Sequence, residues 1–412
     1  MCIFATCFTA CNSNGKGSAE NNGQNSGNDV AAQLSGTYDI TMWVSELKGV
    51  AELTQQQIDA FEAANPGIII NASIEGVAEA DAGSKILNDV VTAPDIFTFS
   101  QDQLARLVQA AALVTPGKNA AETIKNTNDS SSVDAASIDG TLYAYPMTSD
   151  NGYFMYYDTS LFSDEDVESL ETLIAKCEEN NVKFRFNLED GWYTASFFFA
   201  TGCKSIWTTD KNGAFLSIED TFNSPEGLLA MKGMQKLAKS PAYDNDANVF
   251  TDAGIVVTGA WNASAAAAHF GENLGATDLP SFEIDGSTYH LGSYTGNKLM
   301  GVKPQADAKK AAVLSMLAQY LTSEECQAQR YAHFGWGPSN KNVQASEDVQ
   351  KDISLSALAK QNQFGQPQGQ IHGSWWDIAK SMGAYAKTAS GDADLQNALD
   401  GYTAAVNKLL EK

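Results

Sequence analysis

Polar and charged side chains follow two predicted strands, and one of these strands ends on an aromatic residue. In an open parallel sheet, ligands bind beyond the carboxyl ends of the strands. An aromatic ring can cover the apolar face of a sugar, and short polar groups can fix its hydroxyls. We therefore expect a sugar site here, although Asp102 could instead only cap the helix predicted over residues 102–112. The residues selected by this rule are Ser45, Glu46, Lys48, Phe99, Asp102 and Gln103.

Further aromatic residues lie beside glycine turns in the second half of the chain. Trp192 and Tyr193 follow the turn Glu189-Asp190-Gly191, Trp261 ends the run VVTGAW, and Trp375 and Trp376 stand together in GSWWDIAK. All seven tryptophans could belong to the core. Aromatic pairs beside glycine turns are more typical of ligand platforms, and this is the interpretation we favour.

The elements that must position these side chains alternate between strand and helix. In YDITMWVS, which starts at Tyr38, apolar residues fall on one face at a period of two. A helix is predicted over residues 49–64, and Asn65-Pro66-Gly67 ends it before the apolar run of residues 68–70. A second helix then leads to the strand of residues 95–99. This alternation predicts an α/β fold with mainly parallel sheets covered by helices.

Composition limits the function classes. With 412 residues the chain can bury two large cores, and a net charge of −24 argues against binding to nucleic acid or attraction to anionic lipid. Beyond the N-terminal region, no segment reaches the roughly 20 apolar residues of a membrane-spanning helix. The sequence contains none of the common hydrolase, P-loop or zinc-protease motifs, and its four histidines are scattered. We expect no enzyme activity, no metal and no cofactor.

The N-terminus resembles that of a bacterial lipoprotein. A short apolar run with small residues precedes Cys11, as at a lipobox, where cleavage leaves a cysteine that carries the lipid. We interpret residues 1–10 as the remnant of a signal peptide and residues 11–35 as a lipidated, flexible tether. The lipid would hold the protein on the extracellular face of the cell membrane. The alternative is that Cys11 is an ordinary thiol.

Six separated segments, taken together, resemble the maltose/maltodextrin-binding family of extracellular solute-binding proteins, which serve carbohydrate ABC transporters. The resemblance covers nearly the whole chain after the tether. The segments are ITMWVSELKG, APDIFTFSQDQL, AYPMTSD, FNLEDGWY, TGAW and GSWWDIAK.

The resemblance implies roles for individual residues. It places Asp150 and Asp190 as carboxylates that bind sugar, and Trp192 and Trp261 as stacking aromatics. Either Trp375 or Trp376 takes a further stacking position. Two family residues are replaced, an acidic one by Leu47 and an arginine by Gln103. The expected ligand residues are Ser45, Glu46, Lys48, Phe99, Asp102, Gln103, Asp150, Asp190, Trp192, Trp261, Trp375 and Trp376.

The implied fold is the two-lobed type II periplasmic-binding fold with the ligand cleft between the lobes. Residues 36–148 and 298–364 would form the first lobe, and residues 149–297 and 365–412 the second. The chain would cross between them near residues 147–149, 294–300 and 364–369.

By this resemblance, a monomeric chain captures malto-oligosaccharides by hinge closure and delivers them to the permease subunits of an ABC importer. The alternatives are a different oligosaccharide, a sugar-sensing lipoprotein, or a glycoside hydrolase that uses two of the carboxylates.

Overall fold

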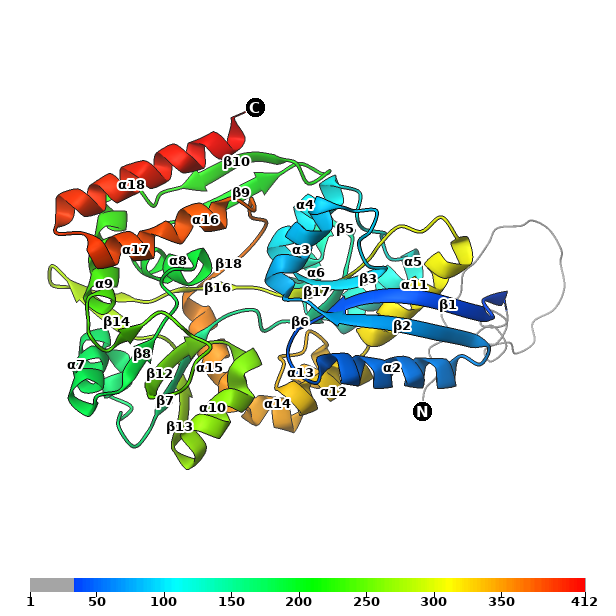
Figure 1. Ribbon diagram of the computed structural model, residues 1–412, viewed down its shortest axis with the longest axis horizontal. Helices are drawn as coiled ribbons and strands as arrows, with labels where there is room; N and C mark the ends of the chain where they lie inside the picture. The colour runs from blue at the N-terminus through cyan, green and yellow to red at the C-terminus, as the bar shows by residue number, and fades with distance from the viewer. Residues whose placement is uncertain (1–32, 412) are drawn as a thin grey trace.

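The first lobe is built on a five-stranded sheet and occupies the right-hand side of Figure 1. The computed structural model describes residues 33–411, so the predictions for Cys11, the signal peptide and most of the tether lie outside the described residues. Across the sheet the strands are β2 (Ile68–Gly76), β1 (Gly36–Val44), β3 (Ile96–Ser100), β17 (Lys298–Val302) and β6 (Tyr145–Thr148).

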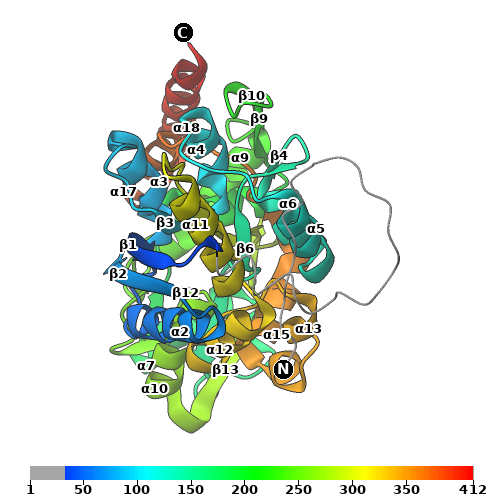
Figure 2. The same cartoon turned by 90° about the vertical axis from the view of Figure 1, so that its right-hand side faces the viewer.

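Helices cover this sheet as the sequence pattern predicted. Tyr38, Ile40, Met42 and Val44 of β1 are all buried, which confirms the predicted apolar face, and the helix predicted over residues 49–64 begins at Val50. Seen from the first-lobe end in Figure 2, α5 and α6 lie on one side and β1 and β2 on the other. The helices are α2 (Val50–Ala64), α3 (Glu79–Asn88), α4 (Leu104–Gln109), α5 (Lys118–Thr127), α6 (Ser130–Ala135), α11 (Ala308–Leu321), α12 (Glu324–Phe334), α13 (Lys341–Gln344) and α14 (Glu347–Lys351).

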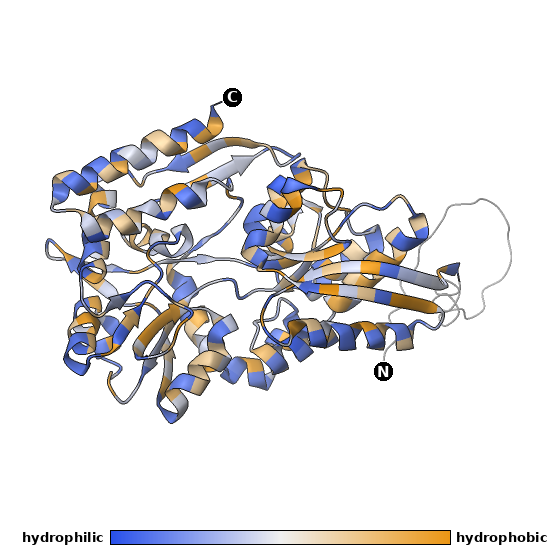
Figure 3. Ribbon diagram, in the orientation of Figure 1, coloured by the Kyte–Doolittle hydropathy of each residue, from blue (hydrophilic) through white to orange (hydrophobic). Residues whose placement is uncertain are grey.

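The second lobe has its own five-stranded sheet and its own core, rich in phenylalanine and tyrosine. Its strands, in order, are β11 (Tyr243–Asp244), β8 (Lys183–Arg185), β12 (Ala253–Thr258), β7 (Phe154–Asp158) and β13 (Leu274–Thr277). Its helices include α7 (Leu170–Asn180), α8 (Gly191–Ala200), α9 (Pro225–Ala238), α10 (Ala263–Phe270), α16 (Trp375–Ala379), α17 (Ser381–Thr388) and α18 (Asp392–Asn407). Figure 3 shows apolar and polar residues mixed along α18, as in a helix with one buried face.

Strand pairing is less uniformly parallel than predicted. The pairs of β1 with β2 and β3 are parallel, but β17 runs antiparallel to both β3 and β6. The second sheet likewise combines parallel pairs around β8 with antiparallel pairs around β7. The physical reason is that β17 and β7 enter their sheets from the opposite lobe and therefore run against the neighbouring strands.

The first two crossings run through β6 and β7 and through β16 (Ser293–Thr295) and β17, and the third lies between α14 and Ile353, before β18 (Gly365–Pro367) and not at residues 364–369 as predicted. Strands β16 and β18 pair in parallel. The helix α15 (Ile353–Gln361) lies against the second lobe, because Ala357 and Leu358 are buried with Phe154 and Tyr156. We therefore assign residues 353–361 to the second lobe, whereas the sequence analysis had placed them in the first.

The hairpin of β9 (Ser205–Thr209) and β10 (Phe215–Asp220) reaches from the second lobe to the first. At its tip Gly213 has a φ of +83°, and a Cβ there would lie 2.1 Å from the carbonyl oxygen of Ala105 in α4. A residue larger than glycine could not approach α4 this closely.

Three cysteines lie in the described part of the chain, and all are buried and free. The pairing of Cys177 with Cys203 that an exported chain could form is therefore absent here. Among residues 33–411, no helix is long and apolar enough to cross a bilayer, and no cluster of three His, Cys, Asp or Glu side chains could hold a metal ion.

Phe99 is a core residue, which corrects its predicted place in the ligand cleft. It lies in β3 with its side chain fully buried in the first-lobe core, and its ring centroid is 5.7 Å from that of Phe97. Because strand side chains alternate between faces, the register of β3 decides which side Phe99 occupies.

We expect Phe99→Ala to lower the free energy of unfolding by about 3–5 kcal/mol, since it leaves a cavity in a packed core. Denaturant unfolding followed by circular dichroism measures the change. The exposed aromatic Tyr385 in α17 provides the control, and Tyr385→Ala should cost less than about 1 kcal/mol. An equally small cost for Phe99→Ala would show that Phe99 is not a core residue.

Candidate ligand-binding site between the lobes

Two tryptophans form an aromatic platform on the second lobe. The ring centroids of Trp192 and Trp261 are 5.9 Å apart, and Tyr153 presents its ring to Trp192 at 4.6 Å. Trp261 lies in the short helix η3 (Ala260–Asn262), directly against Gly259, where a Cβ would be 2.0 Å from the indole. The glycine turn therefore allows the indole to lie on the backbone, as the TGAW motif suggested.

Asp190 begins the helix that carries this platform. Its Oδ1 accepts a hydrogen bond from the backbone N–H of Trp192 at 2.9 Å, which is an N-cap of α8. Burial raises the pKa of Asp190, although this hydrogen bond and the nearby Lys380 oppose the shift. The carboxylate lies next to the aromatic platform, where the sequence placed it, and it also fixes the start of α8.

The structure separates the two neighbouring tryptophans of α16. Trp375 is fully buried in the second-lobe core, where its Nε1 donates to the hydroxyl of Tyr402 at 2.9 Å. This burial corrects the prediction that Trp375 could be a ligand residue. Trp376 is half-buried, and its Nε1 donates to Asp102 Oδ2 of the first lobe at 3.3 Å. Trp376 is the member of the pair that faces the other lobe.

Asp102 lies at the junction between the lobes. Its side chain is 4 % exposed, Gln368 donates to its Oδ1 at 3.2 Å, and Arg106 lies 3.7 Å from its Oδ2. Burial raises the pKa of Asp102 to about 6, although Arg106 and Trp376 oppose the shift. No side-chain capping bond is present at η1 (Gln101–Gln103) or at α4, so helix capping does not explain this residue.

Gln103 is turned away from the junction, which corrects its predicted role. Its Oε1 accepts from the backbone N–H of Gly83 at 2.5 Å, and its Nε2 donates to the carbonyl of Glu79 at 2.7 Å. The buried amide thereby satisfies backbone groups in the first turns of α3. Gln103 holds η1 against α3 and has no free polar atom for a ligand on that side.

The three residues predicted after the first strand lie on the loop between β1 and α2. Ser45 is buried, whereas Glu46 and Lys48 are exposed. The backbone at Glu46 packs against Gly76, where a Cβ would be 3.0 Å from the Glu46 Cα. Their contacts with a ligand stay a prediction.

Asp150 is buried at the first crossing. Its Oδ2 accepts from the backbone N–H of Gly337 at 2.8 Å, and its Oδ1 has no hydrogen-bond partner within the described chain. Sequence reasoning missed two residues at this crossing: Lys298, which pairs with Thr148 across the strands, and Trp336, which precedes Gly337. The ammonium of Lys298 lies 5.1 Å from the ring centroid of Trp336 and 5.3 Å from that of Trp261. The sequence offered one signal for this site: Lys298 begins a strand whose other residues, Leu299 to Val302, are apolar.

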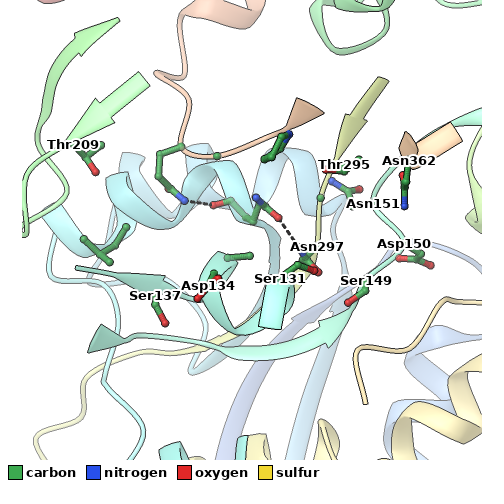
Figure 4. A pocket seen from close by; sticks show the side chains of 18 of the residues that line it. Ser131, Asp134, Ser137, Ser149, Asp150, Asn151, Thr209, Thr295, Asn297 and Asn362 are labelled. Carbon is green, nitrogen blue, oxygen red and sulfur yellow. Dashed lines mark hydrogen bonds between the residues drawn. The ribbon is translucent and has the colours of Figure 1, made fainter. Parts of the chain in front are cut away.

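A cavity of about 680 Å³ lies beside the crossing segments and is shown in Figure 4. Polar side chains line it from α6, from the crossings and from the β9–β10 hairpin, including Asp134, Asn151, Asn297 and Thr209. Asn297 donates to Gln101 Oε1 at 2.8 Å in its wall. None of the tryptophans of the platform lines this cavity. The region of Trp192, Trp261 and Trp376 between the lobes, which shares Asp150 with the cavity, is therefore the better candidate for a sugar-binding site.

A family model described as bacterial extracellular solute-binding protein matches residues 56–357, which is more than half of the chain. The chain belongs to this family. Solute-binding proteins of this kind have two lobes that close on a ligand, which explains why the candidate residues come from both sheets. No curated protein sequence matches the chain.

Solved structures agree with this assignment. A protein solved with acarbose is 28% identical over 91% of this chain and 100% of its own, with a TM-score of 0.79. A maltodextrin-binding protein from L. casei, solved without ligand, is 18% identical over 92% of this chain and 100% of its own, with a TM-score of 0.75. The GacH receptor of Streptomyces glaucescens is 17% identical over 91% and 98%, with a TM-score of 0.75. The last two comparisons show the shared fold.

The buried carboxyl of Asp102 should make stability depend on pH. The pKa of Asp102 rises from 3.8 to about 6 on folding, so the folded state holds the proton more tightly. The tighter binding of this proton contributes about 3 kcal/mol to the free energy of unfolding below about pH 4, and the contribution is lost as the pH rises through about 6. In Asp102→Asn the contribution is absent, so the variant should gain stability relative to the wild type between about pH 4 and about pH 7.

Urea unfolding at several pH values measures this difference. Asp377→Asn changes an exposed aspartate of the same helix as Trp376 and should follow the wild-type profile. Parallel profiles for Asp102→Asn and the wild type would contradict the burial of this carboxyl.

Proposed function

We propose that this solute-binding protein captures malto-oligosaccharides, or pseudo-oligosaccharides such as acarbose, and delivers them to an ABC importer. The observation that carries the proposal is the platform of Trp192 and Trp261 on one lobe, together with the bond from Trp376 to Asp102 across the junction. Indole faces cover the apolar faces of glucose rings, and carboxylates accept hydrogen bonds from hydroxyls.

The three carboxylates at the junction, of which Asp102 and Asp150 are buried, suit binding. Trp376 donates to Asp102, the backbone of Gly337 to Asp150, and the backbone of Trp192 to Asp190. Each carboxylate is thus held in place by a hydrogen bond from a protein N–H group. Fixed acceptors of this kind orient hydroxyls without needing to move, which favours capture over the proton transfers of a glycoside hydrolase.

Closure would couple binding to transport. The Trp376–Asp102 bond forms between residues of different lobes, so it exists only when the lobes meet. A ligand shifts the lobes from mostly open to mostly closed if it binds the closed state better by about 5.5 kcal/mol. Several stacked rings and charged hydrogen bonds can supply a difference of this size.

The known ligands of similar structures support this ligand class. One was solved with acarbose, and another, 20% identical with a TM-score of 0.70, is a cyclo/maltodextrin-binding protein complexed with maltotetraose. Both ligands are chains of linked hexose-like rings with apolar faces and hydroxyl edges. The platform described above has a matching chemistry. A different oligosaccharide, or a sensory role at the same site, is the second candidate.

A titration tests the proposal. We expect calorimetry to show saturable binding of maltotriose or acarbose, and no binding of xylotriose, by residues 33–412. Trp376→Ala should weaken binding by about tenfold to hundredfold, because a covering ring and the donor to Asp102 are both lost. The control Tyr385→Ala should bind as the wild type does. Cleavage of the sugar during the titration, or failure of every malto-oligosaccharide and acarbose to bind, would contradict the proposal.

We also propose that the protein is lipid-anchored at Cys11. The small residues before Cys11 and the polar stretch after it support this, and so does membership of an extracellular family. Expressed in a bacterium and labelled with radioactive palmitate, the wild type should carry label and sediment with membranes. The control Cys11→Ser should carry no label. Equal labelling of both proteins would exclude Cys11 as the lipid attachment site.

A further inference from the structure

Several buried polar atoms at the junction between the lobes have no hydrogen-bond partner within residues 33–411. Buried polar groups are normally hydrogen-bonded in native proteins, so each exception needs an explanation. A bound ligand would supply the missing partners at a site that lies between two lobes. The atoms are Thr148 Oγ1, Asp150 Oδ1, Trp192 Nε1 and Trp336 Nε1.

Lys298 adds a charge to this group. Its side chain is 6 % exposed, and its ammonium lies between the rings of Trp261 on the second lobe and Trp336 on the first. The two rings stabilise the cation through their faces, but they accept none of its hydrogen bonds in the ordinary geometry. No hydrogen bond or salt bridge joins this Nζ to another described residue, so its N–H groups are available to an acceptor.

Asp150 supplies the complementary group. The backbone N–H of Gly337 donates a hydrogen bond to Asp150 Oδ2, and Oδ1 accepts none from the described residues. The ring of Trp336 contacts the Lys298 ammonium, and the backbone of the next residue, Gly337, binds the Asp150 carboxylate. The two charged groups therefore contact consecutive residues of the chain. Glycine is needed there, since a Cβ on residue 337 would lie 2.7 Å from the Asp150 Cβ. Lys298 pairs with Thr148 across strands β17 and β6, two residues before Asp150, and it forms no salt bridge with Asp150.

We propose that Lys298 is a ligand-binding residue that determines specificity, and that it donates to a sugar hydroxyl whose own hydrogen is donated to Asp150. An ammonium can only donate and an ionised carboxylate can only accept, whereas a hydroxyl does both. The inference rests on the proposed function of the same site and narrows the ligand class. At the position between Lys298 and Asp150 it selects a hydroxyl over an ionised carboxylate, such as that of a uronic acid, because the carboxylate has no hydrogen to offer Asp150.

A purely structural role for Lys298 is unfavourable. A buried charge without an ionic partner costs folding free energy, and an apolar side chain of similar length would avoid that cost. The following residues of β17 are Leu299, Met300, Gly301 and Val302, and all are buried. A methionine at position 298 would therefore continue the apolar pattern of the strand. A role in binding explains a lysine at this position, whereas packing does not.

The test compares Lys298→Met and Lys298→Arg with the wild type. Without ligand, we expect Lys298→Met to melt at the same temperature as the wild type or higher. By calorimetry, the wild type should bind maltotriose and not trigalacturonate. Lys298→Met should bind maltotriose about tenfold to hundredfold more weakly, and Lys298→Arg should recover part of the loss. Lys309, exposed on α11, supplies the control, and Lys309→Met should bind normally.

Each other outcome has a defined meaning. Unchanged affinity of Lys298→Met for maltotriose would overturn the inference at any melting temperature, and a lower melting temperature beside it would make Lys298 structural. Preferential binding of trigalacturonate by the wild type would overturn the hydroxyl assignment. If the wild type binds neither maltotriose nor acarbose, the proposed function fails. The melting temperatures of Lys298→Met and the wild type without ligand then decide on Lys298 alone. A destabilised methionine variant still overturns the role of Lys298, and a stabilised one still supports it.

Discussion

The arrangement of the site depends on one hydrogen bond between the lobes, from the indole of Trp376 to the carboxyl of Asp102. It joins a helix of the second lobe to the end of a strand in the first. The contact buries Asp102, and burial is the main cause of its raised pKa. An ionised carboxyl in such a place is costly unless donors or opposite charges surround it; Gln368 supplies a second hydrogen bond, and Arg106 supplies a positive charge 3.7 Å away. Only a particular placement of the lobes brings all these groups together.

The crossing segments keep that placement adjustable. They are joined largely by neutral amides: Asn151 donates to Gln368 at 3.1 Å, Asn297 to Gln101 at 2.8 Å, and Gln370 to the backbone of Gln101 at 3.1 Å. Neutral hydrogen bonds contribute modestly to stability and can exchange partners with water. The cores of the lobes are separate, so a change at the crossings moves each lobe as a body without disturbing its packing.

The junction also shows a compromise between stability and binding. Indole donors of Trp192 and Trp336 and a carboxylate oxygen of Asp150 are buried without hydrogen-bond partners in the described chain, and the ammonium of Lys298 contacts only aromatic rings. A core built only for stability would replace them with apolar groups. Binding sites commonly retain such unsatisfied groups, because a ligand that fits supplies the missing bonds, and one that does not leaves them unpaired.

The sequence alone determined the elements, the alternating α/β order and most of the residues that gather at the junction. Period-two patterning fixed β1, because one buried face repeats every second residue along the chain. The tertiary structure decided which side each candidate faces. Phe99 and Trp375 are core residues, Gln103 binds the backbone of α3, and α15 packs on the second lobe. Lys298 and Trp336 meet Trp261 from distant parts of the chain. Local periodicity shows that a side chain is buried, but its partner depends on how strands and helices from separate segments pack, and that information is not local.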